Sequence, residues 1–115
     1  MKDDSEQREL DFAPLVPSDV PAGATIEERF QAFHGANPHV YSNLARLCLR
    51  QRERGLRRWG IKAAFEILRF QALETAGEEY KLNNSYAPLY ARLLVRRHPE
   101  LREFFELRNR RTRRG

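Results

Sequence analysis

Few of the features that would assign a chemistry to this chain occur in its 115 residues. The one cysteine, Cys48, cannot form an internal disulfide, and its isolation fits a reducing compartment. No apolar run approaches the roughly 18 residues that a membrane span requires. The acidic first ten residues also lack the apolar segment of a secretory signal. We therefore expect one cytoplasmic domain that makes no membrane contact.

Catalytic and metal-binding patterns are missing as well. His34 and His39 are five residues apart with Pro38 between them, so they do not share a helical face. Cys48 is flanked by leucines and is expected in the core. No phosphate-binding glycine loop, dinucleotide fingerprint or nucleophile elbow occurs. We expect no enzyme activity, no metal and no cofactor.

Lysine is scarce, and arginine carries almost all of the positive charge. Only three of the 21 basic residues are lysines, and the net charge is +5. Residues 1–24 hold two basic and six acidic residues, a charge of −4, so the remainder carries +9. A basic domain attracts polyanions, and nucleic acid is the commonest such partner.

The acidic first part, residues 1–24, is interrupted by Pro14, Pro17 and Pro21 and shows no periodic apolar face. It is predicted to be a flexible, disordered arm. Such an arm either has no role of its own, or its carboxylates shield the basic domain by mimicking phosphates. Residues 25–108 are the expected helical domain, and residues 109–115 are an expected disordered basic tail.

Apolar spacing predicts an all-α fold of about five helices in that domain. Capping signals place the helix boundaries. The expected boundaries are a Thr25–Glu28 capping box, a left-handed Gly35, an Asn37 N-cap before Pro38, and helix ends at Arg54–Gly55 and at Thr75.

The third helix, residues 61–75, is apolar around most of its circumference, which predicts burial on several sides at the centre of the fold. Lys62 and Glu66 form an i, i+4 pair on its remaining solvent strip. A modified helix-turn-helix also fits, with this helix supporting a fourth that reads DNA. The connector 77–83 is longer than the usual 3–4-residue turn of that motif.

The fourth helix, residues 84–97, divides into two faces at 100° per residue. Its inner face is apolar and aromatic, and its outer face is polar and basic near the helix start. This pattern is typical of a recognition helix, although a packing helix with a solvated face has it too. The inner residues are Tyr86, Leu89, Tyr90, Leu93 and Leu94, and the outer residues are Asn84, Ser85, Pro88, Arg92 and Arg96.

Two further arginine clusters strengthen the nucleic-acid interpretation. Residues 46–58 hold six arginines against Glu53, and the like charges of Arg46, Arg50 and Arg54 repel at i, i+4, i+8. Trp59, beside this cluster, is expected to anchor the core, the alternative being a base-stacking platform. The predicted nucleic-acid-binding residues are Arg50, Arg54, Arg57, Arg58, Asn84, Ser85, Arg92, Arg96, Arg110 and Arg111.

Four segments together resemble a group of small helical phage and prophage proteins for which no activity is established. The segments are "FQAFHGANPHVY", "IKAAFEILRF", "KLNNSYAPLYAR" and "PELREFFELR". The resemblance covers about residues 26–108 and omits the acidic arm. It implies a phage context and supplies no catalytic residue.

The favoured hypothesis is a phage-derived DNA-binding accessory or regulatory protein with duplex DNA as its partner. The alternative is a protein-interaction module, such as an inhibitor of a host or defence protein, with Phe70, Val95 and Trp59 as exposed anchors. A structural or virion component is a third option. The oligomeric state and any DNA sequence preference stay open.

Overall fold

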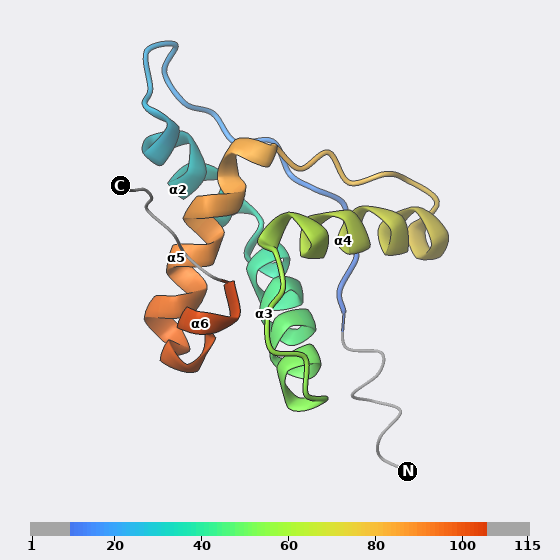
Figure 1. The fold of residues 1–115 in the computed structure, drawn as a ribbon. Coiled ribbons are helices and arrows are strands. Elements are labelled where there is room, and N and C mark those ends of the chain that lie inside the picture. The colour runs from blue at the N-terminus through green and yellow to red at the C-terminus, as the bar shows by residue number, and fades with distance from the viewer. Residues whose placement is uncertain (1–9, 106–115) are drawn as a thin grey trace.

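The computed structural model describes residues 10–105 and confirms the all-α prediction. Five α-helices and two single-turn 3-10 helices make up this part of the chain, which contains no strand (Figure 1). The α-helices are α2 (Ile26–Ala36), α3 (Pro38–Glu53), α4 (Ile61–Ala76), α5 (Ala87–Arg97) and α6 (Arg102–Phe105). The 3-10 helices are η1 (Asn84–Tyr86) and η2 (Pro99–Leu101).

Helix ends follow local chemistry, with one correction. The capping box forms as predicted, because the Glu28 N–H donates to Thr25 Oγ1 and the Thr25 N–H donates to Glu28 Oε1. Gly35, predicted to end α2, instead lies inside it. The break comes two residues later, because Pro38 disfavours a helical conformation at the residue before it. Left-handed glycines do follow α3 and α4, at Gly55 (φ 103°) and Gly77 (φ 82°).

One aromatic cluster joins α2, α3, α4 and α5. Tyr90 is fully buried, and its ring lies 4.7 Å from that of Phe30 and 6.0 Å from that of Phe65, centroid to centroid. The His34 ring stacks on Phe30 and meets the edge of Tyr41. The predicted inner face of residues 84–97 is therefore confirmed as the face that packs.

Helix α4 is less buried than predicted. Its inner face, including Phe65 and Leu68, is fully buried, but Phe70 is 61% exposed and Leu73 is 50% exposed. Figure 1 shows why: the first half of α4 lies against α3 and α5, while its second half projects from the bundle. The bundle therefore covers only one side of α4 instead of the several sides that its composition suggested.

The connection from α4 to α5 is not a helix-turn-helix. The chain leaves the far end of α4 and returns in an extended path over residues 77–83 to η1 (Figure 1). The start of α5 consequently lies beside the start of α4, since both line one groove. A helix-turn-helix has a turn of only about 3–4 residues between its helices.

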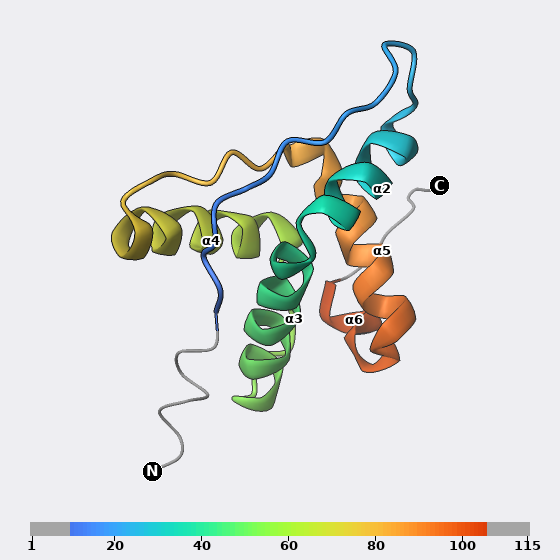
Figure 2. The ribbon, with the colours of Figure 1, turned by 180° about the vertical axis from the view of Figure 1, so that it is seen from behind.

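The N-terminal strap, defined as residues 10–16, lies on the helical domain. Figures 1 and 2 show this segment crossing α4 on one face of the molecule. The fully buried amide of Asn43 accepts from the Asp11 N–H (2.8 Å) and donates to the Asp11 carbonyl (2.9 Å). Asn37, also fully buried, makes the same pair of bonds with Val16, at 2.6 and 2.9 Å.

The flexible-arm prediction for residues 1–24 is therefore wrong for residues 10–16, which the helical domain holds in place, while residues 1–9 lie outside the described part. The prolines do prevent a helix here, so the main chain lacks helical hydrogen bonds. The buried side-chain amides of Asn37 and Asn43 bond to main-chain N–H and C=O groups of the strap instead. Asn37 occupies the N-cap position of α3 as predicted, but its side chain makes no capping bond there. It binds the strap instead.

We predict that Asn43→Ala lowers the free energy of unfolding by about 1–3 kcal/mol, because it removes both partners of the Asp11 main chain. Ser42→Ala, at the exposed neighbouring position, should change it by less than about 0.5 kcal/mol. Urea denaturation followed by circular dichroism measures both. Equal effects of the two substitutions would contradict a stabilising role for the hydrogen bonds between Asn43 and Asp11.

A pH prediction follows from His34. Burial, followed by the positive charge of Arg97, lowers the pKa of His34 below 6.5. On acidification the unfolded chain takes up this proton first, so His34 contributes stability above pH 6.5 that is lost as the pH falls below that value. We expect the unfolding free energy to fall from about pH 7 to pH 5 less steeply in His34→Gln than in the wild type. Parallel curves would contradict this.

Candidate nucleic-acid interface

The end of α3 and the connector to α4 form an arginine-rich surface. Gly55 turns the chain there, and residues 56–58 after it are exposed. Of the predicted residues, Arg54, Arg57 and Arg58 are exposed and Arg50 is half-buried. Arg52, which the prediction omitted, is exposed as well.

Some of these arginines already have partners within the fold. Arg46, Arg50 and Arg58 each interact with another group of the chain. Two of the three arginines of the predicted i, i+4, i+8 ladder, Arg46 and Arg50, are therefore not without a partner in the chain. The best candidates for binding an external anion are consequently the exposed residues Arg52, Arg54 and Arg57.

Trp59 holds this connector in place. Its main-chain N–H donates to the carbonyl of Phe104 at 2.8 Å, and the centre of its ring lies 6.2 Å from that of the Phe104 ring. The indole is half-buried and packs against the core, as predicted for an anchor. A hollow of about 290 Å³ lies next to it, lined by Arg52, Gly55, Leu56, Arg57, Glu100, Glu103 and Phe104. Two carboxylates thus face the inner edge of the arginine surface.

The outer face of residues 84–97 is exposed as predicted, but its two ends differ. Arg92 and Arg96 are exposed on α5. Arg97, also exposed, instead lies over a ring of α3, with its guanidinium carbon 4.9 Å from the centre of the Tyr41 ring. At the other end, Asn83 caps η1 by accepting from the Ser85 N–H at 2.8 Å.

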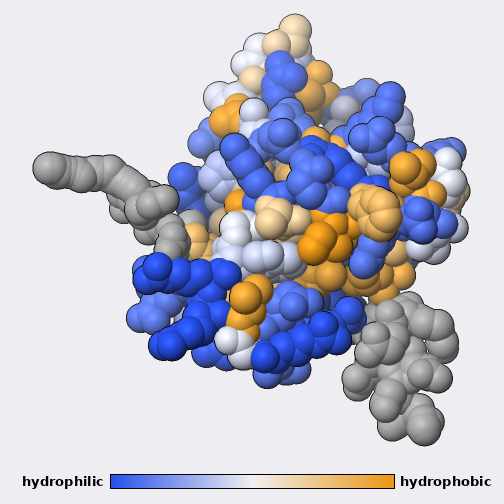
Figure 3. All heavy atoms as spheres, turned by 45° about the vertical axis from the view of Figure 1, so that its right-hand side comes forward, coloured by the Kyte–Doolittle hydropathy of each residue, from blue (hydrophilic) through white to orange (hydrophobic). Residues whose placement is uncertain are grey.

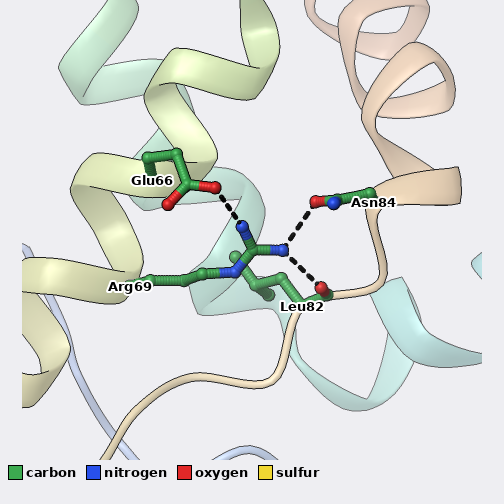
Figure 4. Close-up of polar contacts among 4 residues, drawn as sticks. All are labelled: Glu66, Arg69, Leu82 and Asn84. Atoms are coloured by element: carbon green, nitrogen blue, oxygen red, sulfur yellow. Dashed lines mark hydrogen bonds and ion pairs between the residues drawn. The ribbon is translucent and has the colours of Figure 1, made fainter.

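The side-chain oxygen of Asn84, a residue predicted to contact a base, instead accepts a hydrogen bond from Arg69. Arg69 Nη2 donates to Asn84 Oδ1 and to the Leu82 carbonyl, both at 2.6 Å, while Nη1 donates to Glu66 Oε2 at 2.7 Å (Figure 4). Glu66 was expected to pair with Lys62 and pairs with Arg69 instead. One guanidinium therefore ties the middle of α4 to the end of the connector and to η1, just before α5.

A groove of about 580 Å³ lies between the starts of α4 and α5. Its walls are mostly apolar, with Lys62, Asn84 and Ser85 as its polar side chains. The other residues that line it are Gly60, Ile61, Ala87, Pro88, Ala91 and Phe105. The polar residues of η1, just before α5, therefore border a hollow, whereas a recognition helix places such residues on a surface that projects into the DNA groove.

The fold separates charge between two regions. Residues 46–58 and 92–105 together hold ten arginines and three glutamates, a net charge of +7. All other residues between 10 and 105 hold four basic and eight acidic side chains, a net charge of −4. Figure 3 shows the most hydrophilic residues gathered along the lower edge of the molecule, the level at which α3 ends in Figure 1. Arg110 and Arg111 of the predicted interface lie outside the described residues.

Between residues 10 and 105 the structure gives no support for a metal site, a reactive cysteine or a membrane-spanning helix. No cluster of histidine, cysteine and carboxylate side chains there could hold a metal ion. Cys48 is fully buried, and burial raises the pKa of its thiol to about 12. None of the helices in that range is both long and apolar enough to cross a bilayer. Comparison with protein-family models, curated proteins and solved structures finds no match for the chain.

We predict that Arg69→Lys lowers the free energy of unfolding by about 1 kcal/mol, because an ammonium cannot serve all three acceptors of the planar guanidinium. Arg92→Lys makes the same chemical change on the exposed face of α5 and should have almost no effect. Urea denaturation compares the two variants. Equal stabilities would show that the Arg69 contacts contribute nothing measurable.

Proposed function

We propose that this protein binds nucleic acid through the arginine surface at the end of α3, as a DNA-binding accessory or regulatory protein without catalytic activity. The charge separation carries the proposal: +7 in the segments that hold this surface against −4 in the rest of residues 10–105. A polyanion approaching such a molecule is attracted to one region and repelled from the other. The phage origin suggested by the sequence resemblance stays a prediction.

The chemistry of the surface fits phosphate better than bases. Arg52, Arg54 and Arg57 are exposed around the turn at Gly55, and guanidinium groups bind phosphate oxygens in bidentate fashion. Contacts of this kind depend on salt and carry no sequence information. Asn84, the best candidate for base recognition, already accepts from Arg69. We therefore propose binding with little sequence preference, to which Arg92 and Arg96 on α5 add a second phosphate contact.

The decisive experiment is fluorescence anisotropy with labelled random-sequence duplex DNA at roughly 50 to 200 mM salt. We expect micromolar or tighter binding at the lowest salt. Arg54→Ala with Arg57→Ala should weaken binding at least tenfold and reduce the log–log salt slope by about two, since each phosphate contact contributes roughly 0.9. Lys62→Ala with Lys81→Ala removes the same charge elsewhere and should change affinity less than threefold.

Each alternative result has a definite meaning. Equal losses in the two double variants would show that net charge alone governs binding, which contradicts a localised interface. A larger loss for Arg92→Ala with Arg96→Ala would move the interface to α5. No binding at the lowest salt by a folded protein would refute the proposal.

A protein-interaction module, such as an inhibitor of a host or defence protein, is the second candidate. Phe70 and Leu73 favour it, because these two large apolar side chains are exposed three residues apart on α4. The other expected anchors do not fit, since Val95 is 8% exposed and Trp59 packs on the core. This candidate becomes the preferred one if the DNA experiment fails.

A further inference from the structure

The N-terminal strap is held in the way that many proteins hold a bound peptide. Its main chain forms two-way hydrogen bonds with Asn43 at Asp11 and with Asn37 at Val16, at distances of 2.6–2.9 Å. In a sheet, a neighbouring strand would supply these donors and acceptors. Here two fully buried side-chain amides supply them, so recognition of the strap ends is independent of the side chains at those positions.

The middle of the strap is bound through one carbonyl and three apolar side chains. The Tyr80 hydroxyl donates to the Ala13 carbonyl, and His39 Nε2 lies 3.1 Å from the same oxygen. Burial, aided by the Asp11 carboxylate, raises the pKa of Tyr80 to about 12, so this hydroxyl keeps its proton at neutral pH. Leu10, Phe12 and Leu15 pack against the core, and Phe12 meets the Tyr80 ring edge to face at 5.8 Å.

The residues that hold the strap all belong to the chain beyond residue 25. They line what we call the strap groove, formed by Asn37, His39, Asn43 and Tyr80 with the adjoining core. Residues 17–24 link the strap to α2 as a loop that stands apart from the helices in Figures 1 and 2. Because the strap precedes every helix among residues 10–105, it can leave the groove without breaking a hydrogen bond of those helices.

We propose that the strap groove is a peptide-binding site, which residues 10–16 occupy in cis and which an extended segment of a partner protein occupies in trans. The partner segment needs apolar side chains at its first, third and sixth positions, spaced as Leu10, Phe12 and Leu15 are. Its remaining side chains face solvent, as those of Asp11, Ala13, Pro14 and Val16 do, but proline is excluded at the second and seventh positions, whose N–H groups donate to the buried asparagines. Domains that bind an extended peptide as an added strand also combine main-chain hydrogen bonds with pockets for a few of its side chains. This inference does not depend on nucleic-acid binding.

A fluorescent, N-acetylated peptide of residues 9–18 tests the proposal on the full-length protein. In the wild type, the tethered strap competes at a millimolar effective concentration, so the peptide should bind weakly. The Phe12→Ser, Leu15→Ser variant weakens the strap and leaves the groove intact. We expect it to bind the peptide at least tenfold more tightly than the wild type does. The same peptide carrying both serines is the matched control and should not bind.

Adding Asn43→Ala to the weakened variant should reduce peptide affinity at least tenfold, which places the peptide in the strap groove. Circular dichroism checks that each variant is folded, and Phe12→Ala alone replaces the double variant if the latter unfolds. Equal, weak binding by the wild type and a folded weakened variant would overturn the proposal. So would a stable wild-type dimer that excludes the peptide, because the occupant would then be a second copy of the chain.

Discussion

Asn37 connects three parts of this fold at one buried point. Its main-chain N–H donates to the Phe33 carbonyl at 2.8 Å at the end of α2, and its position before Pro38 makes it the N-cap of α3. Its Nδ2 group donates to Phe33 and to Val16, and its Oδ1 accepts from Val16. A fully buried amide must find such partners, because an unsatisfied one would cost about 1–3 kcal/mol. The orientation of α2 on α3 and the path of the strap therefore depend on each other.

The aromatic cluster is attached to this junction. The rings of Phe30, His34, Tyr41 and Tyr90 come from α2, α3 and α5, and Phe65 adds α4. Aromatic pairs prefer edge-to-face or offset contacts, so a shift of one helix disturbs several rings together. The cluster also contains His34, whose pKa is lowered by burial and by the positive charge of Arg97. Packing of the core and sensitivity to pH thus share the same residues.

The two proposals concern different surfaces of the domain. The arginine surface is at the turn after α3, where Arg52, Arg54 and Arg57 lie outside the packed helices. The strap groove involves the start of α3 and the segment around Tyr80. Long-range charge governs the first surface, whereas short-range hydrogen bonds and apolar contacts govern the second. Salt should consequently affect binding at the arginine surface far more than binding at the groove.

The sequence alone determined the local features: the helix count, the capping box at Thr25, the break at Asn37–Pro38 and the two faces of residues 84–97. Interactions between residues three or four positions apart decide such features, and these are readable from spacing. Only the tertiary structure decided which residues meet across long separations. Hydrogen bonds join Asn43 to Asp11 across 32 residues and Tyr80 to Ala13 across 67 residues. Another joins Arg69 to Asn84 across 15 residues.

Those distant contacts explain where the sequence-based predictions failed. Prolines and acidic residues in 1–24 correctly excluded a helix, but they carry no sign that buried asparagines elsewhere would bind the main chain. Asn84 has the composition of a base-reading residue, but the return of residues 77–83 along α4 places it beside Arg69. Periodicity predicts which face of a helix is apolar, and only the packed chain shows how much of that face is covered, as the exposure of Phe70 demonstrates.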